Sequence, residues 1–269
     1  MGIRETTGTV LVALAAALLL WAYLRVLFKS AALAWSEPGR FPIFEWRWPE
    51  AVATLGLSGF FLAGALASFG GKPGAVTVGS LQASLALYAA IVLLAVGFLV
   101  FRNNNPADVF GLAPEEGWGR IAVAALGGLL LALPAVYGGQ FLGYQLSGPD
   151  SQAQPIVQFL VENKTWDARL MVVLVGGIAA PLTEEVIFRG CLYGLLRQWW
   201  GRLAALAVSS LVFALIHGHL ASLPALFLLA AALVLIYEAT GTLWAPIAAH
   251  ALFNGINILA AIQWPDLMK

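Results

Sequence analysis

The chain has 269 residues, of which 61% are hydrophobic and only 10% are charged, whereas soluble domains carry about 25% charged residues. Its mean hydropathy of +0.86 excludes an ordinary water-soluble domain, so the lipid bilayer is the expected environment. The 14 basic and 14 acidic residues balance, and nothing in this charge balance points to nucleic acid or to another strongly charged partner.

Apolar stretches long enough to span a bilayer recur along the whole chain, since a membrane-spanning helix needs about 20 mostly apolar residues. The N-terminal part contains four of them, at about residues 9–28, 51–69, 80–101 and 120–146. For the first stretch a cleaved signal peptide is the alternative, but the length of the stretch favours a retained helix. The last hundred residues hold four more, at about 168–196, 202–217, 220–238 and 243–264. The sequence therefore predicts an all-α, polytopic membrane bundle of about eight transmembrane helices.

Polar segments connect these stretches. Residues 36–50 combine tryptophan with arginine, which is typical of a segment at the membrane interface. The loop at 102–119 contains Asn-Asn-Asn-Pro and is expected to lie in water. Inside the polar loop 147–166, residues 155–163 have apolar side chains on one helical face, which predicts a short surface helix.

Ionisable residues inside the spans are the most informative feature, because each costs about 2.5–3.5 kcal/mol at the middle of a helix. Nearly all of them lie after residue 180. Glu185 and Arg189 are four residues apart in the order that favours an ion pair on a helix. His250 and Asn254 are also four apart, so their side chains project from one face. Glu184 is rotated about 100° from Glu185 and can face a different neighbour.

The spacing around a predicted turn brings two of these residues together. Trp200 and Gly201 are the expected turn between two antiparallel spans, and Glu184 and His217 stand at equal distances along the chain on its two sides. Residues at equal distances from the turn lie at the same depth, so Glu184 and His217 are expected to face one another. Phe213 precedes His217 by one helical turn and is expected to brace its ring.

These residue types fit the hydrolysis of a peptide bond, which needs a base for water, donors for the oxyanion and a proton for the leaving amine. Glu184 is the expected base, and His217 would share the water and pass the proton. His250 and Asn254 would donate to the oxyanion. A zinc site formed by Glu184, His217 and His250 is an alternative, although the usual zinc-binding helix with two histidines around a glutamate is absent.

Two further polar residues are expected to have structural roles. Cys191 is the only cysteine, so no intrachain disulfide can form, and we expect it to be a small packing residue in an apolar helix. Glu238 stands at the end of its span and is expected to reach the membrane surface.

Three ordered motifs on successive apolar helices give a family resemblance. They are Glu-Glu-x-x-x-Arg at 184–189, Phe-x-x-x-His at 213–217 and His-x-x-x-Asn at 250–254. Together they resemble the type II CAAX prenyl endopeptidase family and its prokaryotic relatives, often called CPBP or Abi proteins. Residues 1–165 resemble the family only in being hydrophobic and multispanning.

The resemblance implies an eight-helix bundle with a polar cavity. In that cavity Glu184 and His217 activate water without a metal cofactor, while His250 and Asn254 stabilise the oxyanion. Glu185, Arg189 and Phe213 have supporting roles. It also implies that the chain is a prokaryotic member of the family, whose substrate is a membrane-associated protein or peptide, with prenylated proteins among the candidates.

The sequence thus predicts an intramembrane endopeptidase of the CAAX-protease type, integral and multi-pass in a prokaryotic inner membrane. We expect one membrane-embedded domain over residues 1–269, with the peptidase core at about 168–264 and less diagnostic helices at 9–146. One alternative is a non-catalytic membrane partner, such as a bacteriocin-immunity or scaffold protein. Another is a proton-coupled transporter that uses Glu184, Glu185 and His217 as a relay.

Overall fold

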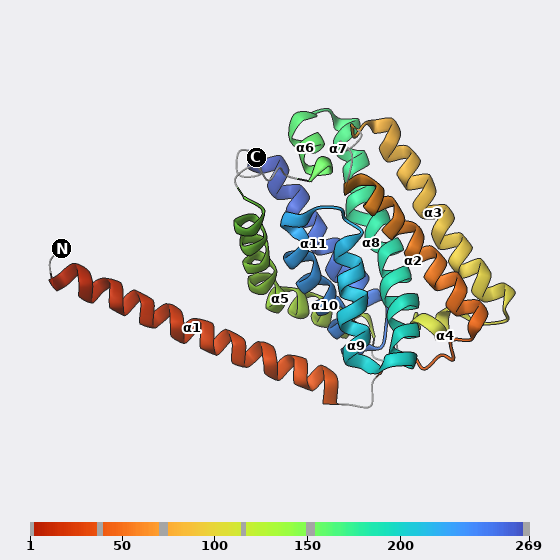
Figure 1. The fold of residues 1–269 in the computed structure, drawn as a ribbon, viewed down its shortest axis with the longest axis horizontal. Coiled ribbons are helices and arrows are strands. Elements are labelled where there is room, and N and C mark those ends of the chain that lie inside the picture. The colour runs from red at the N-terminus through yellow and green to blue at the C-terminus, as the bar shows by residue number, and fades with distance from the viewer. Residues whose placement is uncertain (1–2, 37–39, 70–74, 114–116, 149–153, 266–269) are drawn as a thin grey trace.

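The computed structural model describes residues 3–36, 40–69, 75–113, 117–148 and 154–265, and these ranges contain helices without any strand (Figure 1). The predicted all-α class is confirmed. The α-helices are α1 (Ile3–Ser36), α2 (Trp48–Phe69), α3 (Val78–Phe101), α4 (Pro106–Phe110), α5 (Trp118–Ser147), α6 (Pro155–Glu162), α7 (Trp166–Val172), α8 (Ala180–Glu184), α9 (Gly194–Leu215), α10 (Leu223–Thr240) and α11 (Trp244–Gln263). Two π-helices, η1 (Val173–Ala179) and η2 (Glu185–Tyr193), and a 3₁₀-helix, η3 (Leu220–Ser222), complete the described elements.

Six segments of the described chain are long and apolar enough to cross a membrane, so the protein is an integral, multi-pass membrane protein. The predicted number of about eight is not confirmed. One of the six, Trp166–Leu215, is 50 residues long and contains the spans predicted at 168–196 and, for most of its length, at 202–217. The span predicted at 9–28 lies within α1, which is not among the six.

The predicted turn at Trp200 and Gly201 is confirmed. Gly201 has a φ of 77°, a left-handed conformation that glycine adopts without steric cost. Phe188 and Phe213 stand at nearly equal distances along the chain on the two sides of Gly201, and their ring centroids are 5.6 Å apart in an edge-to-face contact. The long segment therefore forms an antiparallel helical hairpin, which brings its two arms together at matching depths.

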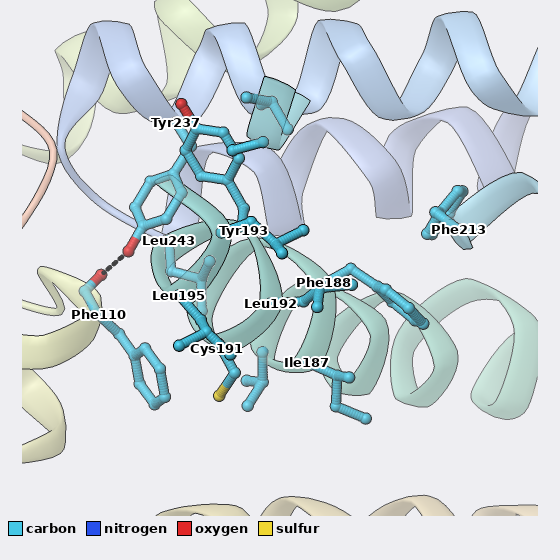
Figure 2. Packing of buried hydrophobic residues seen from close by; sticks show 14 of the residues in the cluster. Phe110, Ile187, Phe188, Cys191, Leu192, Tyr193, Leu195, Phe213, Tyr237 and Leu243 are labelled. Atoms are coloured by element: carbon cyan, nitrogen blue, oxygen red, sulfur yellow. Dashed lines mark hydrogen bonds between the residues drawn. The ribbon is translucent and has the colours of Figure 1, made fainter. Parts of the chain in front are cut away.

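Buried side chains of η2 form the middle of the largest apolar cluster, which Figure 2 shows from close by. Phe188 and Phe213 lie at one end of the view, and Tyr193 and Tyr237 lie at the other. Cys191 is buried inside this cluster as a free thiol, as expected of a packing residue. The cluster fixes η2 against α9 and α10 and so holds the polar residues of η2 in place.

The expectation that the loop at 102–119 lies in water is wrong for its middle part. The loop contains α4, whose Phe110 is buried. The Phe110 carbonyl accepts hydrogen bonds from the Tyr237 hydroxyl at 3.3 Å (Figure 2) and from the Leu243 backbone N–H at 3.0 Å. Asn105 caps α4 by accepting a hydrogen bond from the Ala107 backbone N–H, and this cap allows so short a helix to form.

The prediction that Glu238 reaches the membrane surface is also wrong, because its carboxylate is buried. Its Oε1 accepts hydrogen bonds from the Tyr193 hydroxyl and from Arg197 Nε, the latter at 2.8 Å. Its Oε2 lies 2.9 Å from Arg202 Nη2. The two arginines flank the turn of the hairpin and supply the opposite charges, so the carboxylate does not need to reach water.

The short helix predicted at 155–163 is confirmed as α6, with Phe159 and Leu160 buried beneath it. Near this end of the bundle, α5 packs closely against η3. A Cβ atom at Gly143 would overlap the carbonyl oxygen of Ala221. Glycine therefore permits this close approach, which builds one wall of the cavity described below.

Candidate active site

A cavity of about 980 Å³ lies among α3, α5, α6, η1, α10 and α11. Four of the predicted site residues line it: Glu184, His217, His250 and Asn254. They come from three separate stretches of sequence, which the hairpin and α11 bring together. Glu185, Arg189 and Phe213 do not line the cavity and are buried behind it.

Glu185 connects two of the predicted motifs. Its Oε1 accepts a hydrogen bond from Arg189 Nη1 at 2.7 Å, which confirms the predicted ion pair. The same oxygen lies 2.7 Å from His250 Nδ1. On the other side of the ring, His250 Nε2 lies 3.8 Å from Glu184 Oε2. His250 is therefore held between two carboxylates, one of which is fixed by a buried arginine.

The hydrogen bonds of the two histidines place a proton on Nδ1 of each ring. His217 Nδ1 lies 2.8 Å from the Phe213 carbonyl, which can only accept, so Nδ1 carries the proton of that bond. His250 Nδ1 donates in the same way to the Glu185 carboxylate. Both rings therefore keep Nε2 for other partners, and both rings line the cavity.

Phe213 holds these groups in position through its ring as well as through its carbonyl. The ring centroid lies 4.9 Å from that of His217, as the predicted bracing contact requires, and 5.7 Å from that of His250. The Arg189 guanidinium lies over the same ring at 4.2 Å, a cation–π contact. One buried aromatic side chain thus contacts three polar residues of the site.

Asn254 is oriented by a carbonyl that a helix distortion leaves free. In η1 the backbone N–H of Ala180 bonds to the Val175 carbonyl, five residues earlier. The next carbonyl, that of Gly176, would bond to residue 181, but Pro181 has no N–H. Asn254 Nδ2 donates to this Gly176 carbonyl at 2.7 Å. The second hydrogen of the same amide remains available to a ligand in the cavity.

The zinc alternative concerns three residues that line this cavity. Within the described ranges, no group of three or more His, Cys, Asp or Glu side chains is arranged so that it could hold a metal ion. Glu184, His217 and His250 share a cavity but do not form such a group. Whether the protein uses a metal stays a prediction, which chelation can test.

The cavity is also lined by polar residues that motif spacing did not reveal. Tyr88 from α3 and Gln140 from α5 belong to the N-terminal half of the chain. Asn257 lies on α11, one turn after Asn254. Gln140 donates to the Ala221 carbonyl at 3.2 Å, which ties α5 to η3 at the cavity wall. The only sequence signal for them is a polar side chain within an apolar span.

Comparisons with known proteins match the chain to membrane peptidases. Residues 166–256 match the family described as "Type II CAAX prenyl endopeptidase Rce1-like". YdiL of Bacillus subtilis (strain 168), a protein named as a membrane peptidase, is 22% identical over 197 residues, which cover 72% of this chain and 78% of YdiL. The membrane-embedded CAAX protease MroQ of Staphylococcus aureus (strain USA300) is 33% identical over 98 residues, which cover 34% of this chain and 40% of MroQ. No solved structure matches the chain. Both relatives are bacterial, in agreement with the predicted prokaryotic membrane location.

Proposed function

We propose that this CAAX-type membrane protease hydrolyses a peptide bond of a membrane-associated protein or peptide with water activated by Glu184. The match of residues 166–256 to the Rce1-like type II CAAX prenyl endopeptidases and the likeness of the chain to bacterial membrane peptidases support the proposal. The observation that carries this proposal is the meeting of Glu184, His217, His250 and Asn254 in one cavity. Substrates with a prenyl group are included among the candidates, and no resident cofactor is invoked.

The first step is the attack of water on the scissile carbonyl. Glu184 accepts a proton from the water as the water oxygen bonds to the carbonyl carbon. His217 Nε2 accepts a hydrogen bond from the same water, because the proton of the ring is on Nδ1, which donates to the Phe213 carbonyl. A carboxylate and a neutral imidazole nitrogen then share the two protons of the water.

The second step is stabilisation and collapse of the tetrahedral intermediate. The free amide hydrogen of Asn254 donates to the oxyanion, and His250 donates from Nε2 when its ring carries both protons. The carbon–nitrogen bond then breaks, and the leaving amine takes the proton that Glu184 received from water, directly or through His217. The products are a carboxylic acid and an amine, and the site returns to its starting state.

Glu185 acts as a positioning residue for His250 in this scheme. Its carboxylate fixes Nδ1 as the protonated nitrogen and so directs Nε2 toward Glu184 and the cavity. We expect Glu185→Gln to lower kcat by at least about 10–100-fold with little change in KM, since losing a group that orients a functional histidine costs about that much or more. Steady-state kinetics of the purified protein measure this.

Because Glu185→Gln leaves the buried Arg189 without its carboxylate, a charge-balanced variant is needed as a companion. Glu185→Gln combined with Arg189→Met removes both charges together and should fold like the wild type. If the double variant folds normally and keeps the wild-type kcat, Glu185 does not position His250 for catalysis.

The test of the proposed function is direct. The detergent-purified protein is offered quenched fluorescent apolar peptides, with and without a prenylated cysteine, in mixed micelles. We expect cleavage, and we expect its rate to be unchanged by a strong chelator. Failure to cleave any peptide would count against the peptidase proposal, and loss of cleavage with the chelator that zinc restores would require a metal-dependent mechanism.

A further inference from the structure

Two side-chain amides on the cavity wall have no part in the reaction steps above. Gln140 and Asn257 both line the cavity and are half-buried. Gln140 Nε2 donates to the Ala221 carbonyl at 3.2 Å. Asn257 Nδ2 donates to the Phe253 carbonyl at 2.8 Å. Within the described ranges this is the one hydrogen bond that each amide makes. A primary amide has two N–H donors and an oxygen acceptor, so each keeps an N–H and its oxygen for a ligand.

The chain directions of α5, α10 and α11 place these two amides relative to one another. α5 packs against both α10 and α11 (Figure 1). Gly128 of α5 lies against Ile236, near the end of α10, and Gly139 lies against Ala225, near its start. α5 and α10 are therefore antiparallel. α10 and α11 are joined only by residues 241–243, and so short a connection makes neighbouring helices antiparallel. It follows that α5 and α11 run parallel.

A ring contact fixes the register of these two parallel helices. The ring centroids of Tyr137 on α5 and Phe253 on α11 are 6.5 Å apart. Gln140 follows Tyr137 by three residues, which places it about 4.5 Å farther along α5. Asn257 follows Phe253 by four residues, which places it about 6 Å farther along α11. The two amides therefore lie at nearly the same depth on neighbouring helices, and Asn257 is within one helical turn of Asn254.

An extended substrate segment needs partners of the kind that these amides offer. When the main chain leaves a helix, its backbone N–H and C=O groups no longer bond to one another. In a membrane each such group without a partner is costly. In an extended chain, successive residues direct these groups to opposite sides. Two amides at one depth on two helices match this alternation, because each offers one donor and one acceptor.

We propose that Gln140 and Asn257 are substrate-binding residues that hold an extended main chain, each pairing with the backbone N–H and C=O of one of two successive residues beside the scissile bond. The inference rests on the proposed function, since it concerns the substrate of the same cavity. Asn257 lies about 4.5 Å along the helix from Asn254, the oxyanion donor, which is little more than one residue of an extended chain, about 3.3–3.6 Å. The site thus recognises the main chain, so it selects an unwound segment and tolerates varied side chains.

Replacing single backbone amides of the substrate by esters tests these contacts, because the ester oxygen takes the place of the N–H without adding bulk. Quenched peptides carry one ester at each position beside the cut in turn, while the scissile bond stays an amide and mass spectrometry locates the cut. We expect the wild-type kcat/KM to fall by about 3–10-fold at two successive positions, the usual weight of one hydrogen bond. A scan without this adjacent pair overturns the inference and leaves the peptidase function standing. Absence of cleavage of the all-amide peptide overturns both.

Two variants assign each sensitive position to one amide. Gln140→Met and Asn257→Leu remove an amide but nearly keep its size, and each should raise KM by about 3–10-fold with little change in kcat, as expected for a contact made equally in the ground and transition states. Gln140→Met should remove the ester effect at one of the two positions and keep it at the other, and Asn257→Leu should do the converse. Gln263→Met is the matched control and should keep both effects, since Gln263 is exposed at the end of α11 and does not line the cavity. Folded Gln140→Met and Asn257→Leu proteins that retain both ester effects would overturn the inference.

Discussion

Glu184→Gln is expected to lower the kcat for peptide cleavage by about 10³-fold, within the range for losing a general base. The amide has nearly the shape of the carboxylate but cannot accept the proton of the attacking water. Since Glu184 lies at the cavity wall, 3.8 Å from His250 Nε2 and outside the Glu185–Arg189 ion pair, the change should leave packing intact. Cleavage of the quenched peptides by the purified variant measures the effect.

Glu45→Gln is a suitable control for this experiment. Glu45 is a carboxylate with a largely exposed side chain that pairs with Arg47, and it does not line the cavity. We expect Glu45→Gln to cleave at the wild-type rate and both variants to unfold at the wild-type temperature. A folded Glu184→Gln protein that keeps more than about a tenth of wild-type kcat would be incompatible with Glu184 as the base. The base would then be sought at His250, whose ring Glu185 orients.

The second large effect is expected far from the cavity, at the buried carboxylate of Glu238. Glu238→Gln should lower the free energy of unfolding by about 3 kcal/mol, since removing one partner of a buried ion pair costs about 3–5 kcal/mol. We expect the lower end of that range because the side chains of Arg197 and Arg202 are 23% and 22% exposed and can turn toward water. Equilibrium unfolding in detergent measures the change.

Comparing Glu238→Gln with Tyr193→Phe separates the contribution of the Glu238 charge to stability from that of its hydrogen bond with Tyr193. Tyr193→Phe removes only the hydroxyl that donates to Glu238 and should cost about 1 kcal/mol. The peptidase activity of the folded fraction should be retained in both variants, because neither residue lines the cavity. If Glu238→Gln unfolds at the same denaturant concentration as the wild type, the ion pairs of Glu238 do not stabilise the hairpin.

Helix distortion and site geometry coincide in this protein. The π-helix η1 supplies the Gly176 carbonyl that orients Asn254, and the π-helix η2 begins at Glu185 and carries Arg189. Such i→i+5 segments are uncommon and often mark functional sites. Here the physical reason can be named at η1: Pro181 cannot donate to the ladder, and the freed acceptor is used by a side chain from another helix.

The sequence by itself determined the features that depend on one helix or on one turn. The length of the apolar stretches predicted a helical membrane protein, because a span must satisfy all its backbone hydrogen bonds internally. Spacing of four residues predicted the Glu185–Arg189 ion pair, because helical geometry fixes which neighbours meet. Equal distances from the turn at Gly201 predicted which residues of the hairpin lie at the same depth, and the Phe188–Phe213 contact agrees.

Only the tertiary structure decided the contacts between helices distant in sequence. Glu185 and His250 are 65 residues apart, and no periodicity relates them. The same holds for Asn254 and Gly176, which are 78 apart. Spacing fixes the face on which a side chain lies, but the rotation and crossing of each helix are set by packing against its neighbours. For the same reason the sequence does not predict the burial of Glu238: its partners come from the hairpin of another segment, and their charges reverse the preference of an isolated carboxylate for water.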